Sequence, residues 1–191
     1  MIQNPEVLID KLIISDYHLP LAKVLSANLN KDLNIFKQQA AGHKKQHKEL
    51  LDKLRKKKKS EADSLFQEAH EEVFSCTDCL KCANCCKTTG PLFTASDISR
   101  ISSKLKMSEK TFTERYLRKD EDNDMVLQHV PCTFLDADNY CSVYEFRPKA
   151  CREYPHTDQK DQASIFHLTL KNASICPAVF DILEELKKNI K

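Results

Sequence analysis

Cys79-Leu80-Lys81-Cys82-Ala83-Asn84-Cys85-Cys86 is the stretch that decides the fold of this chain. Two thiolates separated by two residues can grip one metal ion, because a short loop returns both sulfurs to one point. The chain holds nine cysteines, an odd number at close spacing, and in a reducing compartment this favours metal binding over disulfides. The predicted ligands are eight of them: Cys79, Cys82, Cys85, Cys86, Cys132, Cys141, Cys151 and Cys176.

The spacing leaves the identity of the metal open between iron and zinc. Three cysteines in a C-x2-C-x2-C pattern with a remote fourth ligand followed by proline are typical of a [4Fe-4S] cluster, and Cys176-Pro177 fits the fourth position. A zinc site with four cysteines is the alternative. The distal cysteines are singletons, so a simple zinc ribbon built from two C-x2-C pairs is a poor match.

The adjacent pair Cys85-Cys86 leaves the number of sites open as well. Neighbouring side chains generally point apart, so one of the two can face a different site. On a continuous helix, Cys79, Cys82 and Cys86 would share a face while Cys85 sits aside. Eight thiolates therefore predict either two four-sulfur sites or one site plus structural thiols. Participation of Cys76 and His156 is left open, and nearby cations would offset the thiolate charge: Lys81, Lys87, Arg147 and Arg152.

Composition excludes several classes of protein. The chain has 191 residues, of which 41% are hydrophobic and 30% charged, so it can bury a core. Glycine occurs only twice, which rules out a dinucleotide-binding G-x-G-x-x-G turn, a phosphate-binding loop and a glycine-rich methyl-donor pocket of the Rossmann type. The radical methyl-donor pattern C-x3-C-x2-C is also absent, because Thr89 stands at its third position.

Residues 1–74 lack cysteine and are predicted to form a helical extension, most simply a helical hairpin. Helix starts are expected at Pro5 and Pro20, with Gly42 as a C-terminal cap and a further start at Ser60. These helices offer a surface for a protein partner. The basic run over 44–59 leaves a nucleic-acid partner open, but no aromatic residue is interleaved with its lysines, and a solvated face beside the acidic stretch 61–72 is favoured.

Residues 75–191 are predicted to form a small α+β cysteine-rich metal-binding domain, which makes the whole chain mainly α. The expected helices cover 95–105, 108–117 and 179–188, and the expected short strands cover 125–130 and 164–170. A small hairpin is expected over 132–144, around the turn signal Asp136-Ala137-Asp138-Asn139.

The N-terminus has no basic region followed by an apolar core, and no apolar run approaches 18 residues. We therefore expect a cytoplasmic protein with no membrane partner. The net charge of +2 gives no general case for a nucleic-acid or membrane partner either.

Beyond the cluster, three further motifs accompany the single cysteines: Cys132-Thr133-Phe134-Leu135, Cys141-Ser142-Val143-Tyr144 and Arg147-Pro148-x-x-Cys151-Arg152-x-Tyr154-Pro155. With the cluster, they make residues 76–178 resemble the CxxCxxCC cysteine-cluster family of zinc- or iron-chelating domains (YkgJ-type), to which flagellin lysine-N-methylase is related. Eight cysteines match family positions, and Cys76 is extra. The chain departs from the family at Ala83-Asn84, where the family often has glycine, and in its helical extension.

The resemblance implies a metal-binding protein that holds zinc, iron or an iron–sulfur cluster. The related methylase implies an alternative, a protein-lysine methyltransferase or redox enzyme. No donor-binding residue in the sequence supports methyl transfer independently.

Overall fold

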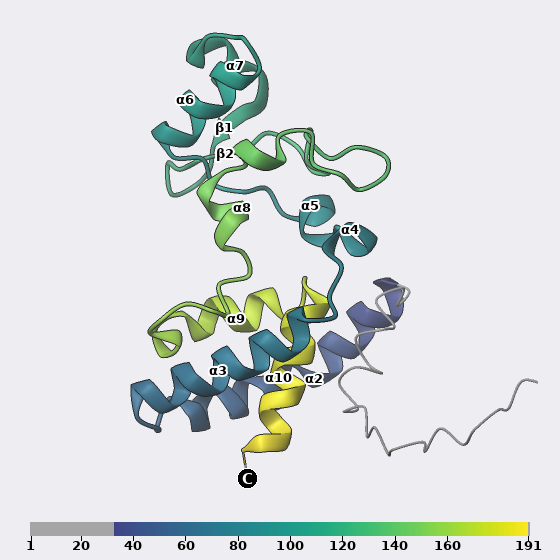
Figure 1. Cartoon of the computed structure of the whole chain (residues 1–191), viewed down its shortest axis with the longest axis vertical. Coiled ribbons are helices and arrows are strands. Elements are labelled where there is room, and N and C mark those ends of the chain that lie inside the picture. The colour runs from purple at the N-terminus through teal and green to yellow at the C-terminus, as the bar shows by residue number, and fades with distance from the viewer. Residues whose placement is uncertain (1–32, 191) are drawn as a thin grey trace, which may run out of the picture.

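The computed structural model describes residues 33–190. It is mainly helical with one two-stranded sheet, which confirms the predicted fold class for this part of the chain. The described residues form two lobes joined by a narrow middle segment that carries α4, α5 and α8 (Figure 1). We call the lobe built by α2, α3, η2, α9 and α10 the helical lobe, and residues 89–148 the distal lobe.

The helical lobe begins with a hairpin of α2 (Leu33–Leu54) and α3 (Lys59–Phe74). A helical hairpin is thus present, but its turn lies at residues 55–58 and not at Gly42 as predicted, and the expected starts at Pro5 and Pro20 lie outside the described residues. The predicted cap at Gly42 is wrong, because α2 runs through this position. A helical glycine costs about 1 kcal/mol, and the helix continues because its buried face extends on to Leu54.

The helix start expected at Ser60 lies close to the observed start of α3. Ser60 and Asp63, however, do not cap the helix. Helix α3 begins at Lys59, one residue before Ser60, and has no side-chain cap. Asp63 instead accepts hydrogen bonds from the backbone N–H groups of Asp161 (3.0 Å) and Gln162 (2.9 Å). This carboxylate therefore ties α3 to the segment that leads into α9.

The C-terminal segment of the chain completes the helical lobe with η2 (Gln162–Ile165), α9 (Phe166–Asn172) and α10 (Pro177–Asn189). The predicted strand over 164–170 is therefore wrong, whereas the predicted closing helix is confirmed. Phe166, Thr169 and Asn172 are buried, a step of three that suits a helix. The ring of Phe166 stacks on that of Phe66, with 5.6 Å between centroids, so packing against α3 decides the local structure.

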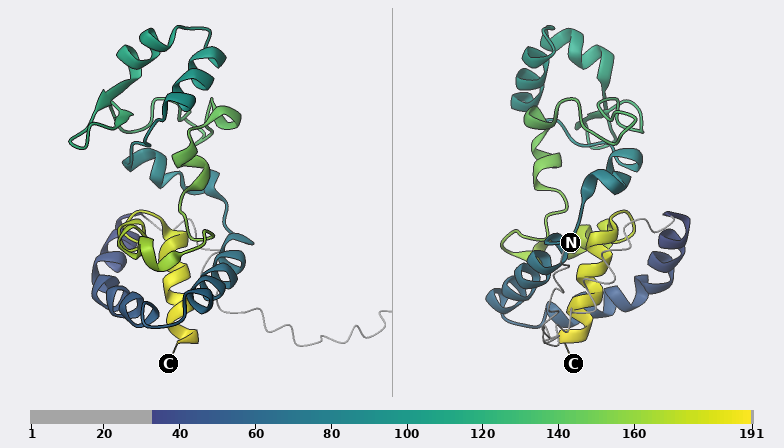
Figure 2. Two further views of the ribbon diagram at one scale, coloured as in Figure 1. Left: turned by 90° about the vertical axis from the view of Figure 1, so that its left-hand side faces the viewer. Right: turned by 45° about the vertical axis from the view of Figure 1, so that its right-hand side comes forward.

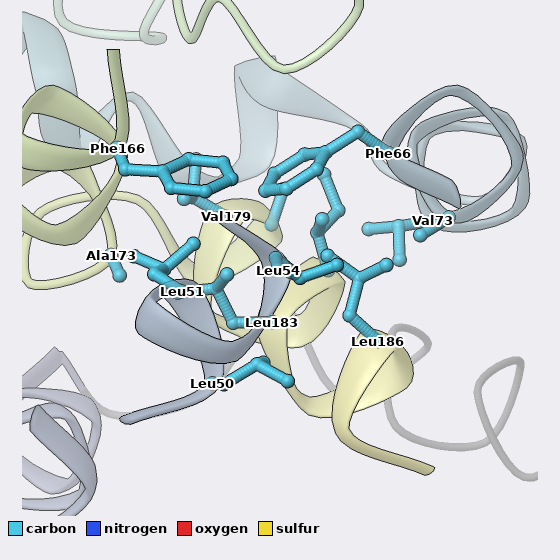
Figure 3. Packing of buried hydrophobic residues seen from close by; sticks show 13 residues of the cluster. Leu50, Leu51, Leu54, Phe66, Val73, Phe166, Ala173, Val179, Leu183 and Leu186 are labelled. Atoms are coloured by element: carbon cyan, nitrogen blue, oxygen red, sulfur yellow. The ribbon is translucent and has the colours of Figure 1, made fainter. Parts of the chain in front are cut away.

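One large hydrophobic core joins the helices of the helical lobe (Figure 3), and a smaller cluster of Phe36, Ala40 and Phe180 lies between α2 and α10. The large core joins residues from α2 and α3 to residues from α9 and α10, among them Leu54, Val73, Phe166, Leu183 and Leu186. Burying each such side chain contributes about 1.5–3 kcal/mol. The division of the chain at residue 74 stays a prediction, and this core includes helices from both sides of it.

The distal lobe contains α6 (Ala95–Lys104), α7 (Glu109–Tyr116), β1 (Leu117–Lys119) and β2 (Met125–Leu127). The two strands pair antiparallel with Leu117 opposite Leu127. The side chains of Thr94 and Asp97 cap α6 reciprocally, and the helix expected over 95–105 is present. A second core built on Ile101, Phe112 and Phe134 fills this lobe.

Short helices carry the cysteine-rich segments between the lobes: α4 (Cys79–Cys82), α5 (Asn84–Thr88) and α8 (Lys149–Glu153). Both views in Figure 2 place these helices where the chain passes from one lobe to the other. The predicted hairpin after Cys132 is present, with an isolated bridge between Leu135 and Cys141, and η1 (Tyr144–Phe146) follows it. Within residues 33–190, no helix has the length and apolar character needed to cross a membrane.

Candidate metal centre

A left-handed residue breaks the cysteine cluster into two short helices. Ala83 has φ 48° and ψ 21°, which ends α4 and starts α5 in a new direction. L-residues with a Cβ rarely adopt this conformation, and glycine adopts it readily. The chain therefore makes this tight turn with an alanine. The interpretation that placed Cys79, Cys82 and Cys86 on one helical face therefore does not apply.

Four of the predicted ligands line a single cavity of about 60 Å³: Cys79, Cys82, Cys85 and Cys176. The first three come from α4 and α5, and Cys176 is the residue that precedes α10. Phe74, Tyr154 and Pro155 form much of the remaining wall. Sulfurs from segments far apart in the sequence thus face the same space.

Asn84 holds the two sides of this cavity together. Its side chain is 4% exposed, and its Nδ2 atom donates a hydrogen bond of 2.6 Å to the carbonyl oxygen of Ile175. Ile175 directly precedes Cys176, whose own backbone N–H donates to the carbonyl of Asn172 at 2.7 Å. This role of Asn84 was not predicted, and its position between Cys82 and Cys85 is the one signal in the sequence that points to it.

Three thiols at this cavity, those of Cys79, Cys85 and Cys176, have a raised pKa. Burial raises the pKa of Cys176 to about 12, although the N–H groups of Val179 and Ala178 donate to its sulfur and oppose the rise. Burial also raises the pKa of Cys79, and the negative charges of Cys82, Asp78 and Cys86 raise it further. A metal ion supplies the positive charge that such a group needs in order to ionise.

The other four predicted ligands, which we call the second group, lie on α5 (Cys86), beside the distal hairpin (Cys132 and Cys141) and on α8 (Cys151). The backbone N–H of Cys132 donates to the carbonyl of Cys86 at 2.8 Å, which brings the distal hairpin to α5. The pKa of Cys151 is raised to about 12, first by burial and then by the charges of Cys86, Cys132 and Cys141. These four thiols are therefore electrostatic neighbours.

Cys85 and Cys86 lie at the junction of the two groups, and their Sγ atoms are 4.0 Å apart. The hydrogen bond with Cys85 and the nearby Lys87 lower the pKa of Cys86 to about 7, against the effect of burial. The same bond, together with burial, raises the pKa of Cys85. Cys86 is thus the thiol of the pair that ionises first.

All nine cysteines carry thiols, and no disulfide joins any two of them. In residues 33–190, no three Cys, His, Asp or Glu side chains meet in an arrangement ready to hold a metal ion. The four cysteines at the cavity line one space without forming a finished coordination shell. Metal sites of this kind commonly form together with their metal.

Two residues whose participation was left open make other contacts. The Sγ atom of Cys76 lies at hydrogen-bond distance from the carbonyl oxygens of Val73 (3.5 Å) and Glu72 (3.8 Å) at the end of α3. Nδ1 of His156 lies 3.0 Å from Nε2 of Gln159.

Tyr154 brings a polar group to the wall of the cavity in addition to the cysteines. It lines the cavity, and its Oη atom is buried without a partner at hydrogen-bond geometry among the described residues. Burial raises the pKa of the phenol most, followed by the charges of Cys176, Cys85 and Cys82, and a looser side-chain interaction with Cys176 adds to the rise. A buried hydroxyl without a partner costs free energy, and a metal-bound thiolate would give it an acceptor. In the sequence, Tyr154 stands out only as part of the motif that begins at Arg147.

Comparison with known protein families gives a match over more than half of the chain. The family model described as "CxxCxxCC: Putative zinc- or iron-chelating domain" matches residues 78–177, which includes α4, α5, both groups of sulfurs and the start of α10. No solved structure matches the chain.

Proposed function

Because the chain belongs to the CxxCxxCC family of zinc- or iron-chelating domains, we propose that it binds zinc or iron through cysteine thiolates and that the cavity between α4, α5 and the start of α10 is its metal centre. Cys79, Cys82, Cys85 and Cys176 are the proposed ligands at this cavity. The proposal rests on one observation above all, the convergence of these four sulfurs on one small space.

The surroundings of the cavity suit metal-bound thiolates. Val179 and Ala178 present backbone N–H groups to the sulfur of Cys176, and such donors stabilise a thiolate. The unsatisfied hydroxyl of Tyr154 adds a further donor. A metal bound here would supply the positive charge that four converging thiolates need, and the chain's own residues would hold the sulfurs in place and exclude water.

Four thiolates are compatible with a zinc ion, with iron and with a [4Fe-4S] cluster. The cysteine spacing that favours a cluster and the singleton ligands that disfavour a zinc ribbon both support iron–sulfur as the finer proposal. A YkgJ-type assignment, a cytoplasmic location, a protein partner for the N-terminal helices and the alternative methyltransferase or redox activity all stay predictions.

Elemental analysis of the full-length protein, purified without oxygen, tests the proposal. We expect at least one equivalent of zinc or iron per chain. Broad visible absorbance with acid-labile sulfide would identify a cluster, and a colourless protein with zinc would identify a simple chelate. Cys176→Ser should lower the metal content, whereas the matched variant Cys76→Ser should not. A wild-type protein that holds no metal, even after anaerobic reconstitution, would overturn the proposal.

A further inference from the structure

We propose that the turn between α2 and α3 is a contact site for the phosphate backbone of a nucleic-acid duplex. The stretch 53–59 holds one apolar residue and six cations, which we call the basic tip: Lys53, Arg55, Lys56, Lys57, Lys58 and Lys59. The proposal does not rest on metal binding, because no residue of the basic tip is a predicted metal ligand or lines the cavity of the metal centre.

The basic tip is displayed on an ordered turn. The backbone N–H of Arg55 donates to the carbonyl of Leu51 at 2.9 Å, and that of Lys57 donates to the carbonyl of Leu54 at 3.0 Å. Leu54 itself is 0% exposed and belongs to the large core of the helical lobe, so it anchors the turn. Five of the six cations are exposed, and Lys57 is half-buried. The backbone that carries these charges is therefore ordered before a partner binds, which lowers the cost of binding.

The acidic stretch 61–72 neutralises little of the basic tip. The amine of Lys57 lies 2.6 Å from Glu61, and that of Lys59 lies 3.0 Å from Asp161 on the segment before α9. Both ion pairs are open to solvent, and such pairs contribute little to stability. The remaining cations have no carboxylate at ion-pair distance within residues 33–190: Lys53, Arg55, Lys56 and Lys58. Binding a polyanion would relieve the repulsion among these charges.

The apolar residues near the basic tip are buried, which decides between kinds of polyanion. Within residues 53–63 the apolar side chains are those of Leu54 and Ala62, and both are in the protein interior. Helices that bind a lipid surface insert an apolar face, and protein interfaces pack aromatic or apolar anchors. The described surface of the tip offers neither, so its charges suit a backbone of phosphates, which cations alone can hold.

The aromatic ring next to the basic tip favours a duplex over a single strand. Proteins that bind single strands stack the bases on accessible aromatic rings. The guanidinium of Arg55 lies 5.7 Å from the ring centroid of Phe166, but this ring is 2% exposed and stacks on Phe66 in the core. In a duplex the bases are already stacked on one another, and the phosphates remain accessible.

The dimensions of the turn suit several phosphates at once. Four residues, 55–58, span at most about 14 Å, and a duplex carries one negative charge per about 1.7 Å of its axis. The turn lies at the end of α3 that is remote from α4 (Figure 1). Because α3 has 16 residues and rises about 1.5 Å per residue, this site and the metal centre are separate.

The test measures binding of fluorescein-labelled DNA and RNA duplexes to the full-length protein by fluorescence anisotropy. If the four cations without an ion pair each contact one phosphate, the logarithm of affinity should fall with the logarithm of salt concentration with a slope of about −3.6, or about 150-fold between 50 and 200 mM salt. The double variant Lys56→Gln/Lys58→Gln should reduce this fall to about 12-fold. The matched control is Lys110→Gln/Lys119→Gln, which removes two exposed lysines of the distal lobe and should keep the wild-type slope.

Three results would overturn the proposal. The first is no binding of either duplex by the wild-type protein at about 50 mM salt, a result that requires no variant. The second is an equal salt dependence in the two double variants, which would show that only net charge matters. The third is tighter binding of a single strand, of phosphatidylserine vesicles or of poly-glutamate than of the duplexes. Metal content measured on the same samples should be equal in all three proteins, so the proposed function stands or falls separately.

Discussion

Replacing Asn84 by alanine tests how the remote ligand Cys176 is held at the first cavity. The Asn84 side chain is buried, and its 2.6 Å hydrogen bond to Ile175 links positions 91 residues apart. The Asn84→Ala variant would leave the Ile175 carbonyl without this donor, and an unsatisfied buried group of this kind costs about 1–3 kcal/mol. We expect the free energy of unfolding to fall by that amount.

The same loss should weaken metal binding, because the metal must then order the segment that Asn84 orders in the wild-type protein. If the whole cost falls on the bound state, about 1–3 kcal/mol corresponds to a decrease in affinity of roughly 5- to 150-fold. Competition with a fluorescent chelator for Zn²⁺ measures this decrease, and urea unfolding of the metal-loaded protein measures stability.

Asn189→Ala serves as the matched control, since Asn189 is exposed at the end of α10. It should change neither quantity. Wild-type affinity in Asn84→Ala, together with an unchanged urea midpoint, would refute the claim that this hydrogen bond positions Cys176.

Three further predictions concern single residues. Ala83→Val should lower the unfolding free energy by about 1 kcal/mol, because a β-branched residue is strained at φ 48°, whereas Ala83→Gly should show no loss in the same urea titration; equal midpoints for the two variants would contradict this. Tyr154→Phe should keep the metal stoichiometry but weaken Zn²⁺ retention roughly tenfold, the size of a lost hydrogen bond to a charged group; unchanged retention would show that the hydroxyl does not contact the bound thiolates. Burial lowers the pKa of His47 from 6.5 although Glu184 lies 2.8 Å away. The contribution of the neutral imidazole to the free energy of unfolding should therefore be fully present above about pH 6.5 and decrease as the pH falls through the lowered pKa. His47→Gln should flatten this decrease in unfolding experiments, and the exposed control His129→Gln should leave it as steep as in the wild-type protein.

The sequence predicted those elements whose signals are local. The helices expected over 95–105 and 179–188 are present as α6 and α10, where Thr94 with Asp97 and Pro177 supply local start signals. The strand predicted over 164–170 is wrong because the secondary structure of this segment depends on a contact with a distant residue. Phe166 packs on Phe66, far earlier in the chain, and no pattern within the segment shows this contact.

For the candidate site, too, local signals could be predicted and contacts between distant residues could not. The choice of eight cysteines came from their spacing and from family resemblance, and it stays a prediction. Their grouping could not be derived, because it depends on the left-handed backbone of Ala83 and on the hydrogen bond between Asn84 and Ile175. Tyr154 was named in a family motif, but the absence of a partner for its hydroxyl among the described residues is visible only in three dimensions.

X-ray absorption spectroscopy of the metal-loaded, full-length protein tests the central claim most directly. For zinc, we predict a first shell of four sulfurs at about 2.3 Å and no light-atom ligand. For iron, we predict sulfur alone in the first shell. A first shell dominated by nitrogen or oxygen would contradict the claim that the thiolates of this chain hold its metal.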